Sequence, residues 1–305
     1  MSLKTIKQKI TAVGKTHKVT RAMEAVSAVK MRKSQERALM ARPYALHAFS
    51  ILKRVRGAVS EREHPLLSPR KEIKNILLVI VTADKGLAGN LNGQVLKECD
   101  RILIESGFSR EQVLVCAIGK KAAEYAARKG FTIIHSLHNL SDVVPLLDMK
   151  AVSARAAELF LSGECDECRI VYTHFISTIS HDVRTRTILP VNERALEKAV
   201  KWARPKTGRF AHEGEEIASA ANYEFEPGAE EVLGALVPHL LNIEVYHALL
   251  EAKASEHSAR MVAMKNATER AEEVGSDLRL LYNKARQAAI TREVSEIVSG
   301  AEAAA

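Results

Sequence analysis

The two ends of the chain constrain its fold most, because each reads as one long helix. Within residues 3–57, only Gly14 and Pro43 interrupt the helical pattern. Residues 239–299 contain no proline and one glycine, Gly275. A helix rises 1.5 Å per residue, so about 50 residues would span roughly 75 Å, more than a small domain needs. The middle of the chain joins the end of one helix to the start of the other. We therefore expect the two helices to pair antiparallel.

The spacing of apolar residues supports this pairing. Apolar residues three and four apart lie on one face of a helix. The N-terminal helix has two such stripes separated by a register shift, which predicts a stutter in a coiled coil. The first stripe consists of Leu3, Ile6, Ile10 and Val13, and the second of Val19, Met23, Val26 and Val29. The C-terminal helix has a heptad seam of small residues, which favours close helix approach. This seam consists of Ala267, Ala271, Val274, Leu278, Leu281, Ala285 and Ala288.

The middle of the chain has a different period. Short continuous apolar runs, typical of strands buried on both faces, occur at residues 76–81, 113–118, 131–134 and 169–175. Residues 183–189 alternate polar and apolar, which indicates an edge strand. Helical patterns at residues 89–106, 120–129 and 149–162 separate the runs. Strands alternating with helices predict a Rossmann-like α/β domain with an open, mostly parallel sheet.

We thus expect an N-terminal helix at residues 1–57, a central α/β domain at 73–195, and a C-terminal helix at 229–305 that pairs with the first. The net charge of +8 is divided unequally among these parts. Residues 1–57 contain 14 Lys and Arg against two Glu, a net of +12, whereas residues 230–305 contain eight against 12, a net of −4. A basic helix of this kind predicts an acidic partner, either a protein surface or nucleic acid.

A search for catalytic motifs identifies no active site. Gly14-Lys15-Thr16 lacks the first glycine of a phosphate-binding loop and the strand that should precede it. The turn at residues 82–90 follows a strand, where α/β proteins often bind nucleotide, but it lacks the glycine fingerprint. Ser180-His181-Asp182 are neighbours in sequence, which a catalytic triad does not require. We expect no cofactor, no metal and no catalytic residue in this chain.

The cysteines and the chain start bear on location. Cys165 and Cys168 form a C-x-x-C without a second ligand pair, so we interpret them as two loop cysteines near solvent. Four cysteines are too few for a disulfide scaffold. No continuous run of 18 apolar residues occurs, so no membrane-spanning helix is expected, and the first residues lack a signal core.

Several segments of the chain together match the motifs of one known protein family. The N-terminal helix matches it at residues 10–26, at Lys30-Met31-Arg32-Lys33 and at Arg42-Pro43-Tyr44. The central domain matches at Gly86-Leu87-Ala88-Gly89-Asn90, where Ala88 stands in place of a frequent cysteine. The C-terminal part matches at residues 223–227, 255–268 and 283–301. Together these segments resemble the gamma subunit of F-type ATP synthase. The resemblance spans nearly the whole chain and is bacterial in style.

The resemblance implies a non-catalytic rotor shaft that couples proton-driven rotation of a membrane ring to ATP synthesis in neighbouring subunits. Its expected partners are the alpha and beta subunits, the epsilon subunit and the c-ring, with no nucleic acid. Its expected location is the cytoplasmic side of a bacterial plasma membrane, reached only through the complex. Two alternatives remain open from the residues alone: a basic coiled-coil protein that binds nucleic acid, and a nucleotide-using α/β enzyme.

The resemblance also implies roles for individual residues. Contact with the lever and catch loops of beta is expected of Lys18, Arg21, Met23, Arg286 and Gln287. A position at the foot, near the ring or epsilon, is expected of Arg32, Lys33, Arg42, Pro43, Tyr44, Gly86, Leu87 and Asn90.

Overall fold

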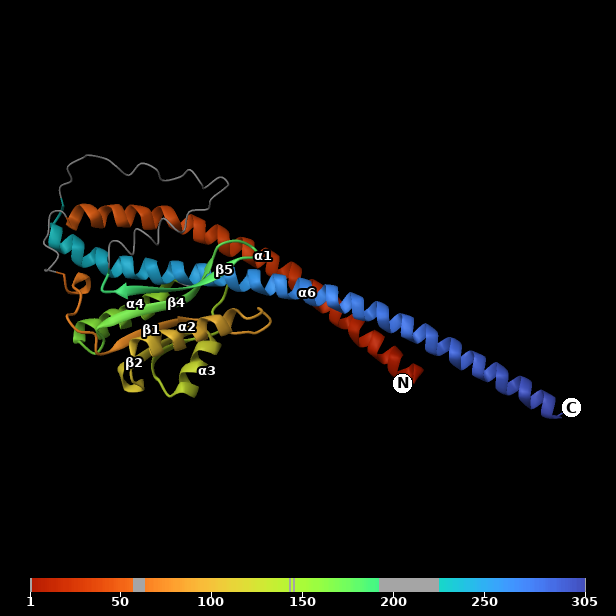
Figure 1. Ribbon diagram of the computed structural model, residues 1–305. Helices are drawn as coiled ribbons and strands as arrows, with labels where there is room; N and C mark the ends of the chain where they lie inside the picture. Colours follow the sequence, from red (N-terminus) through yellow and green to blue (C-terminus); the bar gives the residue numbers. More distant parts are fainter. Residues whose placement is uncertain (1, 57–63, 143, 145, 192–224, 305) are drawn as a thin grey trace. The chain divides into compact units, whose positions relative to one another are not determined.

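The computed structural model describes residues 2–56, 64–142, 144, 146–191 and 225–304. The chain divides into two compact units, which are described separately: Met1–Ala28 with Arg260–Ala305, and Val29–Ala259. Helix α1 (Leu3–Arg56) and helix α6 (Ala229–Ala304) each contribute to both units. The two long terminal helices expected from the sequence are therefore present, and Figure 1 labels them with the other elements.

The larger unit contains a five-stranded sheet in the order β3-β2-β1-β4-β5. The strands are β1 (Ile76–Val81), β2 (Val113–Ile118), β3 (Thr132–Leu137), β4 (Glu167–Phe175) and β5 (His181–Leu189). Strands β1 to β4 are parallel, and β5 pairs antiparallel with β4 at the edge. This arrangement confirms the open, mostly parallel sheet and the predicted edge strand, and it shows that this strand is antiparallel.

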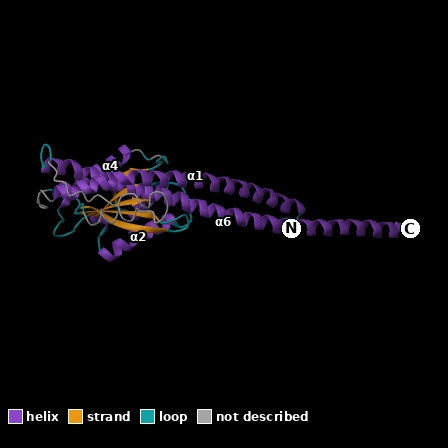
Figure 2. Cartoon of the chain, turned by 90° about the horizontal axis from the view of Figure 1, so that it is seen from above, coloured by secondary structure: helices purple, strands orange, loops and turns teal. Residues whose placement is uncertain are grey.

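Helices cover both faces of this sheet, because successive side chains of a strand point to opposite faces. Residues 76, 78 and 80 of β1 pack in one cluster with α2 (Leu91–Ser106) and α3 (Lys120–Lys129). Residues 77, 79 and 81 pack in another with α4 (Leu146–Ser162) and residues 233–252 of α6. Figure 2 shows the strands between their helices. All six side chains of β1 are buried, as its continuous apolar sequence predicts.

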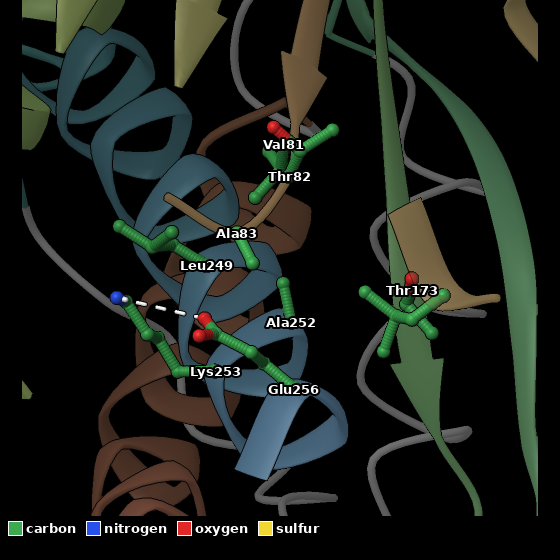
Figure 3. A pocket seen from close by; sticks show the side chains of 9 residues that line it. Val81, Thr82, Ala83, Thr173, Leu249, Ala252, Lys253 and Glu256 are labelled. Atoms are coloured by element: carbon green, nitrogen blue, oxygen red, sulfur yellow. Dashed lines mark ion pairs between the residues drawn. The ribbon is translucent and has the colours of Figure 1, made fainter. Parts of the chain in front are cut away.

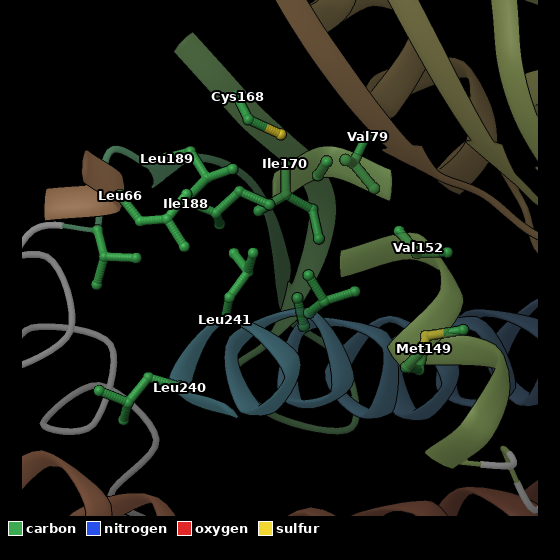
Figure 4. Packing of buried hydrophobic residues seen from close by; sticks show 14 of the residues in the cluster. Leu66, Val79, Met149, Val152, Cys168, Ile170, Ile188, Leu189, Leu240 and Leu241 are labelled. Carbon is green, nitrogen blue, oxygen red and sulfur yellow. The ribbon is translucent and has the colours of Figure 1, made fainter. Parts of the chain in front are cut away.

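The core on the α6 face joins segments that are far apart in sequence. Figure 4 shows Leu241 of α6 directed toward Ile170 and Ile188 of the sheet, and Leu240 of α6 and Met149 of α4 belong to the same cluster. The short 3-10 helix η1 (Pro65–Leu67) adds Leu66 and Leu67, and α1 adds Ala48, Leu52 and Val55. A second short 3-10 helix, η2 (Arg110–Gln112), precedes β2. Residues 48–55 of α1 are thus anchored in the same core as α6.

The smaller unit is an antiparallel helix pair. The Thr268 hydroxyl donates a hydrogen bond of 2.8 Å to the Thr20 hydroxyl, and a Cβ on Gly275 would lie 3.7 Å from Cγ1 of Val13. These two pairs run in opposite directions along the helices, which confirms the predicted coiled coil. Ile6, Thr20, Ser27, Met264 and Thr268 are buried here.

The predicted stutter in the N-terminal helix is wrong. The buried positions Ile6, Thr20 and Ser27 are separated by multiples of seven, so one heptad register continues through small polar residues. Val19, Val26 and Val29 are instead 54–57% exposed. In α6, the half-buried Ala271, Val274 and Leu278 agree with the predicted seam, whereas Leu281 and Ala288 are exposed.

One further expectation needs correction, and one is qualified by composition alone. Cys165 and Cys168 are both fully buried, so they are not loop cysteines near solvent. Cys168 belongs to the core on the α6 face, and burial raises the pKa of the Cys165 thiol to about 11. Helix α6 does contain an 18-residue window long and apolar enough to span a membrane by composition, although half of that window is buried inside the protein. A core helix that packs on a sheet passes the same test.

Candidate partner-binding surfaces

The residues predicted to meet a partner's lever loop lie together on α1. Lys18 and Arg21 are exposed, and Met23 is half-buried on the same stretch. Thr20, between them, faces Thr268 and is buried, which fixes the direction of its neighbours. The helix pair therefore presents two permanent cations and part of a methionine to solvent. This surface can form exposed ion pairs with an acidic partner, each about 0–1 kcal/mol.

Arg286 and Gln287 form a separate surface on α6. Both side chains are exposed. Eighteen residues separate Thr268 from Arg286, which corresponds to roughly 27 Å along the helix. Beyond them, α6 exposes large apolar side chains: Ile290, Val294, Ile297 and Val298 are 47–70% exposed. The two groups of residues predicted to contact the beta subunit therefore form two separate sites on the helix pair.

The residues predicted for the foot do not form one cluster. Pro43 and Tyr44 are exposed on α1, and the Tyr44 ring packs edge-on against the His239 ring, with centroids 5.5 Å apart and a hydrogen bond between the hydroxyl and Nε2. Arg42 lies beside them in the helix, but its side chain is outside the described set. Arg32 and Lys33 are exposed ten residues earlier.

The Gly86, Leu87 and Asn90 turn lies elsewhere in the same unit. Ala88 and Leu91, within and just after this turn, pack against Ala259 of α6. Ala259 is twenty residues from His239, or roughly 30 Å along α6. Leu87 is 61% exposed and has a φ of 64°, so the turn holds a large apolar side chain in solvent. The structure thus places this turn far from Tyr44, and the two groups cannot meet the same small partner surface.

The crevice in which an α/β enzyme would bind a nucleotide is occupied by α6. A small pocket lies at the carboxyl end of β1, lined by Val81, Thr82 and Ala83. Figure 3 shows Leu249, Ala252, Lys253 and Glu256 of α6 closing its other side, with the last two joined by an ion pair of 3.7 Å. Among the described residues, no group of His, Cys, Asp and Glu could hold a metal ion. The nucleotide-enzyme alternative therefore has no support here.

A buried ionic cluster, which sequence analysis did not find, lies between α6 and the sheet. Glu251 Oε2 lies 2.8 Å from Nδ1 of His174 on β4 and 3.7 Å from Nη2 of Arg186 on β5, and Oε1 lies 3.3 Å from Nδ1 of His247. All four side chains are nearly buried. Burial alone would raise the pKa of Glu251, but His247, His174 and Arg186 outweigh it and lower the pKa to about 2. Glu251 is therefore a carboxylate at neutral pH.

Glu244, two turns earlier on α6, is a buried acid whose pKa is shifted in the opposite direction to that of Glu251. Its side chain is 5% exposed, and Oε1 has no hydrogen-bond partner among the described residues. Burial raises its pKa from 4.5 to about 7, and the charge of Arg186 on β5 offsets this only in part. Cys168 on β4 also faces it. Because the folded state holds this proton more tightly, Glu244 contributes stability below about pH 4.5, and that contribution is lost as pH rises to about 7.

We expect Glu244→Gln to stabilise the protein at pH 8, by on the order of 3 kcal/mol, and to have little effect at pH 5. The variant keeps the shape and removes the cost of a buried charge. Thermal unfolding of both proteins across this pH range measures the difference. Glu158→Gln, which breaks an exposed ion pair with Arg155, is the control and should show no such trend. A difference in melting temperature that is independent of pH would contradict the assignment.

Comparisons with solved structures show that this fold resembles chains found in ATP synthase assemblies. The chain superposes on a chain from the central stalk and c-ring structure of Tetrahymena thermophila mitochondrial ATP synthase, with a TM-score of 0.59, 24% identity, and coverage of 82% of this chain and 99% of that one. A Euglena gracilis mitochondrial ATP synthase chain gives a TM-score of 0.63 at 19% identity, covering 99% of this chain and 94% of that one. These likenesses support the fold.

The sequence comparisons identify the family. A family model described as ATP synthase matches residues 2–304. The ATP synthase gamma chain of Roseiflexus castenholzii is 39% identical over 305 residues, covering 100% of this chain and 99% of that one. The gamma chain of Chloroherpeton thalassium is 34% identical, covering 99% and 98%. The chain belongs to the ATP synthase gamma-chain family.

Proposed function

We propose that this chain is the central rotor shaft of a bacterial F-type ATP synthase. The observation that supports this most is the match to gamma chains over essentially the whole of both sequences. The antiparallel helix pair and the α/β fold are the two parts that a shaft and its base require. The chain itself would perform no chemistry. It would couple rotation of a membrane ring to conformational change in the catalytic subunits.

We propose that its partners are the alpha and beta subunits around the helix pair, and epsilon and the c-ring at the base. Solved relatives named as central stalk, rotor and c-ring assemblies support a place in such an assembly. The alpha, beta and epsilon subunits are proposed from membership of the gamma-chain family. The same reasoning gives a peripheral position on the cytoplasmic side of the plasma membrane. The candidate membrane window of α6 is not needed for that attachment, because half of it lies in the folded core.

The exposed side chains suit a contact that must form and break on every turn. Residues 1–57 have a net charge of +12, and Lys18 and Arg21 are exposed within them. Surface ion pairs are weak and exchange readily with solvent, so they transmit force without trapping one angle. We therefore propose that these two residues and Met23 meet an acidic lever loop of beta.

We propose a separate role for the far end of α6. Arg286 and Gln287 would hydrogen-bond a catch loop of beta, because both are exposed and can donate several bonds. The exposed apolar residues from Ile290 to Val298 would form a slim tip inside the ring of partners. Sparse apolar side chains on a single helix give only limited burial, which allows the tip to turn.

At the base, we propose the foot role for Arg42, Pro43 and Tyr44, with Arg32 and Lys33 about three turns earlier on α1. We revise the role of Gly86, Leu87 and Asn90. Their turn packs near Ala259, roughly 30 Å along α6 from His239. We therefore propose that the exposed Leu87 side chain meets a different partner surface from Tyr44.

Replacing Arg286 and Gln287 together with alanine is expected to slow steady-state ATP hydrolysis by the assembled complex about tenfold, since a charge-assisted hydrogen bond is worth about 1.5–3 kcal/mol. Assembly should persist, because both side chains are exposed. Arg292→Ala, an exposed arginine on the same helix, is the matched control. Unchanged turnover, or loss of the chain from the complex, would argue against the proposed contact.

Co-purification tests the proposed function as a whole. The native chain should be isolated with alpha and beta subunits in a complex that hydrolyses ATP, and the isolated chain should not hydrolyse ATP. A chain that purifies without these subunits would refute the proposal. Tight, salt-sensitive DNA binding by the purified chain would support the nucleic-acid alternative instead.

A further inference from the structure

The loop between β3 and α4 receives polar side chains from both long helices. Asp142, in this loop, has one carboxylate oxygen 2.9 Å from Nζ of Lys30 on α1 and the other 3.0 Å from Nε2 of His257 on α6. Arg37 of α1 also donates a hydrogen bond of 2.7 Å to the Asp142 carbonyl. One residue of the α/β fold is therefore bonded to both helices, through its side chain and its main chain.

A second residue of the loop, two positions before Asp142, is bonded to α6. Lys253 of α6 donates a hydrogen bond of 3.3 Å to the carbonyl of Leu140. Lys253 and His257 lie one turn apart on α6, and their side chains are 11% and 5% exposed. The Asp142 side chain is 37% exposed, and the nearby cations lower its pKa against the effect of burial. The carboxylate is thus charged at neutral pH.

The polar contacts matter most for α1. Between residues 29 and 40, both polar contacts that α1 makes with described residues of the α/β fold end on Asp142. The apolar contacts of α1 with the core lie further along, at Ala48, Leu52 and Val55. About 15 residues separate these two attachments, or roughly 20 Å. Among the described residues, α1 is therefore attached to the α/β fold at two places, Asp142 and the core at residues 48–55, and Met31 and Ser34 are buried beside the first.

Helix α6 does not depend on Asp142 to the same degree. Its residues 233–252 pack in the core along their whole length. Ser255 donates a hydrogen bond to the Thr173 carbonyl, and Ser258 donates one to the Thr178 carbonyl. Apolar contact is non-directional and resists sliding weakly, whereas hydrogen bonds fix direction. Loss of Asp142 would release one end of the α1 segment and leave α6 in place.

We infer that Asp142 is a positioning residue that clamps the start of this α1 segment to the α/β fold and so stiffens the base of the shaft against twisting. This inference rests on the proposed rotor function. A helix held at one point can turn relative to the sheet, and rotation of the base would then be lost as strain before it reached the partners. A helix held at two points transmits the rotation of the base to the partners.

Hydrogen exchange of the assembled complex tests the clamp. In Asp142→Ala, amides of residues 29–40 should exchange about tenfold faster, the equivalent of about 1.4 kcal/mol. Amides of residues 240–252 of α6 should be unchanged. A variant that was simply less stable would exchange faster in both segments. Lys30→Met should reproduce part of the effect, and the double variant should show less than the sum. Glu158→Gln, which breaks an ion pair within α4, should change neither segment.

ATP-driven proton pumping in vesicles tests the mechanical role. Asp142→Ala should hydrolyse ATP at the normal rate when the proton gradient is collapsed, yet build a smaller gradient when it must pump against one. Unchanged exchange in residues 29–40 would refute the clamp. Faster exchange with normal pumping would refute its role in transmission. If the wild-type chain did not assemble with alpha and beta subunits, the proposed function would fail, and exchange of the isolated full chain would still decide the clamp.

Discussion

Glu251→Ala is expected to lower the free energy of unfolding by about 3–5 kcal/mol, because removing one partner of a buried ionic cluster leaves the others uncompensated. Arg186, His174 and His247 all contact this carboxylate, and each is nearly buried. The guanidinium of Arg186 also stacks on Tyr172, 5.0 Å from the ring centroid, so it cannot turn to solvent without disturbing the core. For a unit of this size the loss corresponds to a fall of roughly 10 °C in melting temperature.

The pH dependence of this effect has a definite sign. The pKa of Glu251 is lowered from 4.5 to about 2 in the folded state. Its contribution is therefore complete above about pH 4.5 and is lost as pH falls toward about 2. Wild type and Glu251→Ala should therefore differ fully above about pH 4.5 and converge as the pH falls toward about 2. Glu244→Gln should show the reverse trend, with its difference growing as pH rises.

A double replacement provides the control. Glu251→Met with Arg186→Met removes both charges and fills the space with apolar side chains, so it should be less destabilising than Glu251→Ala alone. Thermal and denaturant unfolding of the full chain, followed by circular dichroism, measures each variant. If the double variant lost as much stability as the two single replacements added together, the cluster would not act as a unit.

The sequence predicted the sheet well because its signal is strong and local. Each of β1 and β2 is a six-residue run of apolar side chains, and both lie in the interior of the sheet with nearly every side chain buried. The edge strand β5 was also predicted from its alternation, although its antiparallel direction was not. In these strands, the hydrophobic pattern of the sequence matches the burial of the side chains, so the pattern alone predicts the strands.

The helix pair shows where the same reasoning fails. Its seam includes Thr20, Ser27 and Thr268, whereas Val19 and Val26 face outward. A search for apolar stripes follows the valines and misses the register. Small polar residues suit the seam because a hydroxyl can bond across it, as Thr268 and Thr20 do. Valines left in solvent on a basic helix are better explained by contact with a partner than by the fold of this chain.

The buried cluster and the clamp could not be predicted from spacing. Glu251 and His174 are 77 residues apart, and Asp142 and His257 are 115 apart. Only the sheet order, which places β4 beside β5 under α6, brings the first pair together. The residues expected at the foot lie apart for the same reason. Tertiary packing places Tyr44 beside His239 and the turn at residues 86–90 beside Ala259, and their sequence motifs alone do not show this.

Gly119→Ala is expected to destabilise the larger unit by about 3 kcal/mol or more, because it combines left-handed backbone with a clash. Gly119 has a φ of 95°, and a Cβ there would lie 2.1 Å from the Thr82 carbonyl oxygen and 2.8 Å from its Oγ1. The Thr82 main chain cannot give way easily. Its amide donates a 2.8 Å hydrogen bond to the Ile118 carbonyl, and its hydroxyl accepts one of 2.8 Å from the amide of Ala122.

A second glycine separates the two contributions. Gly107 also has a positive φ, 69°, but a Cβ there would meet nothing within 4 Å. Gly107→Ala should therefore cost only about 1–2 kcal/mol, from the backbone alone. Urea unfolding of both variants measures the difference, and equal losses would show that the contact with Thr82 contributes nothing. The Gly119 amide also donates to the Leu137 carbonyl at 2.7 Å, so one backbone position joins the ends of β1, β2 and β3. Since Leu137 immediately precedes the loop that contains Asp142, Gly119→Ala should also loosen residues 29–40 of α1 in hydrogen exchange, whereas Gly107→Ala should not.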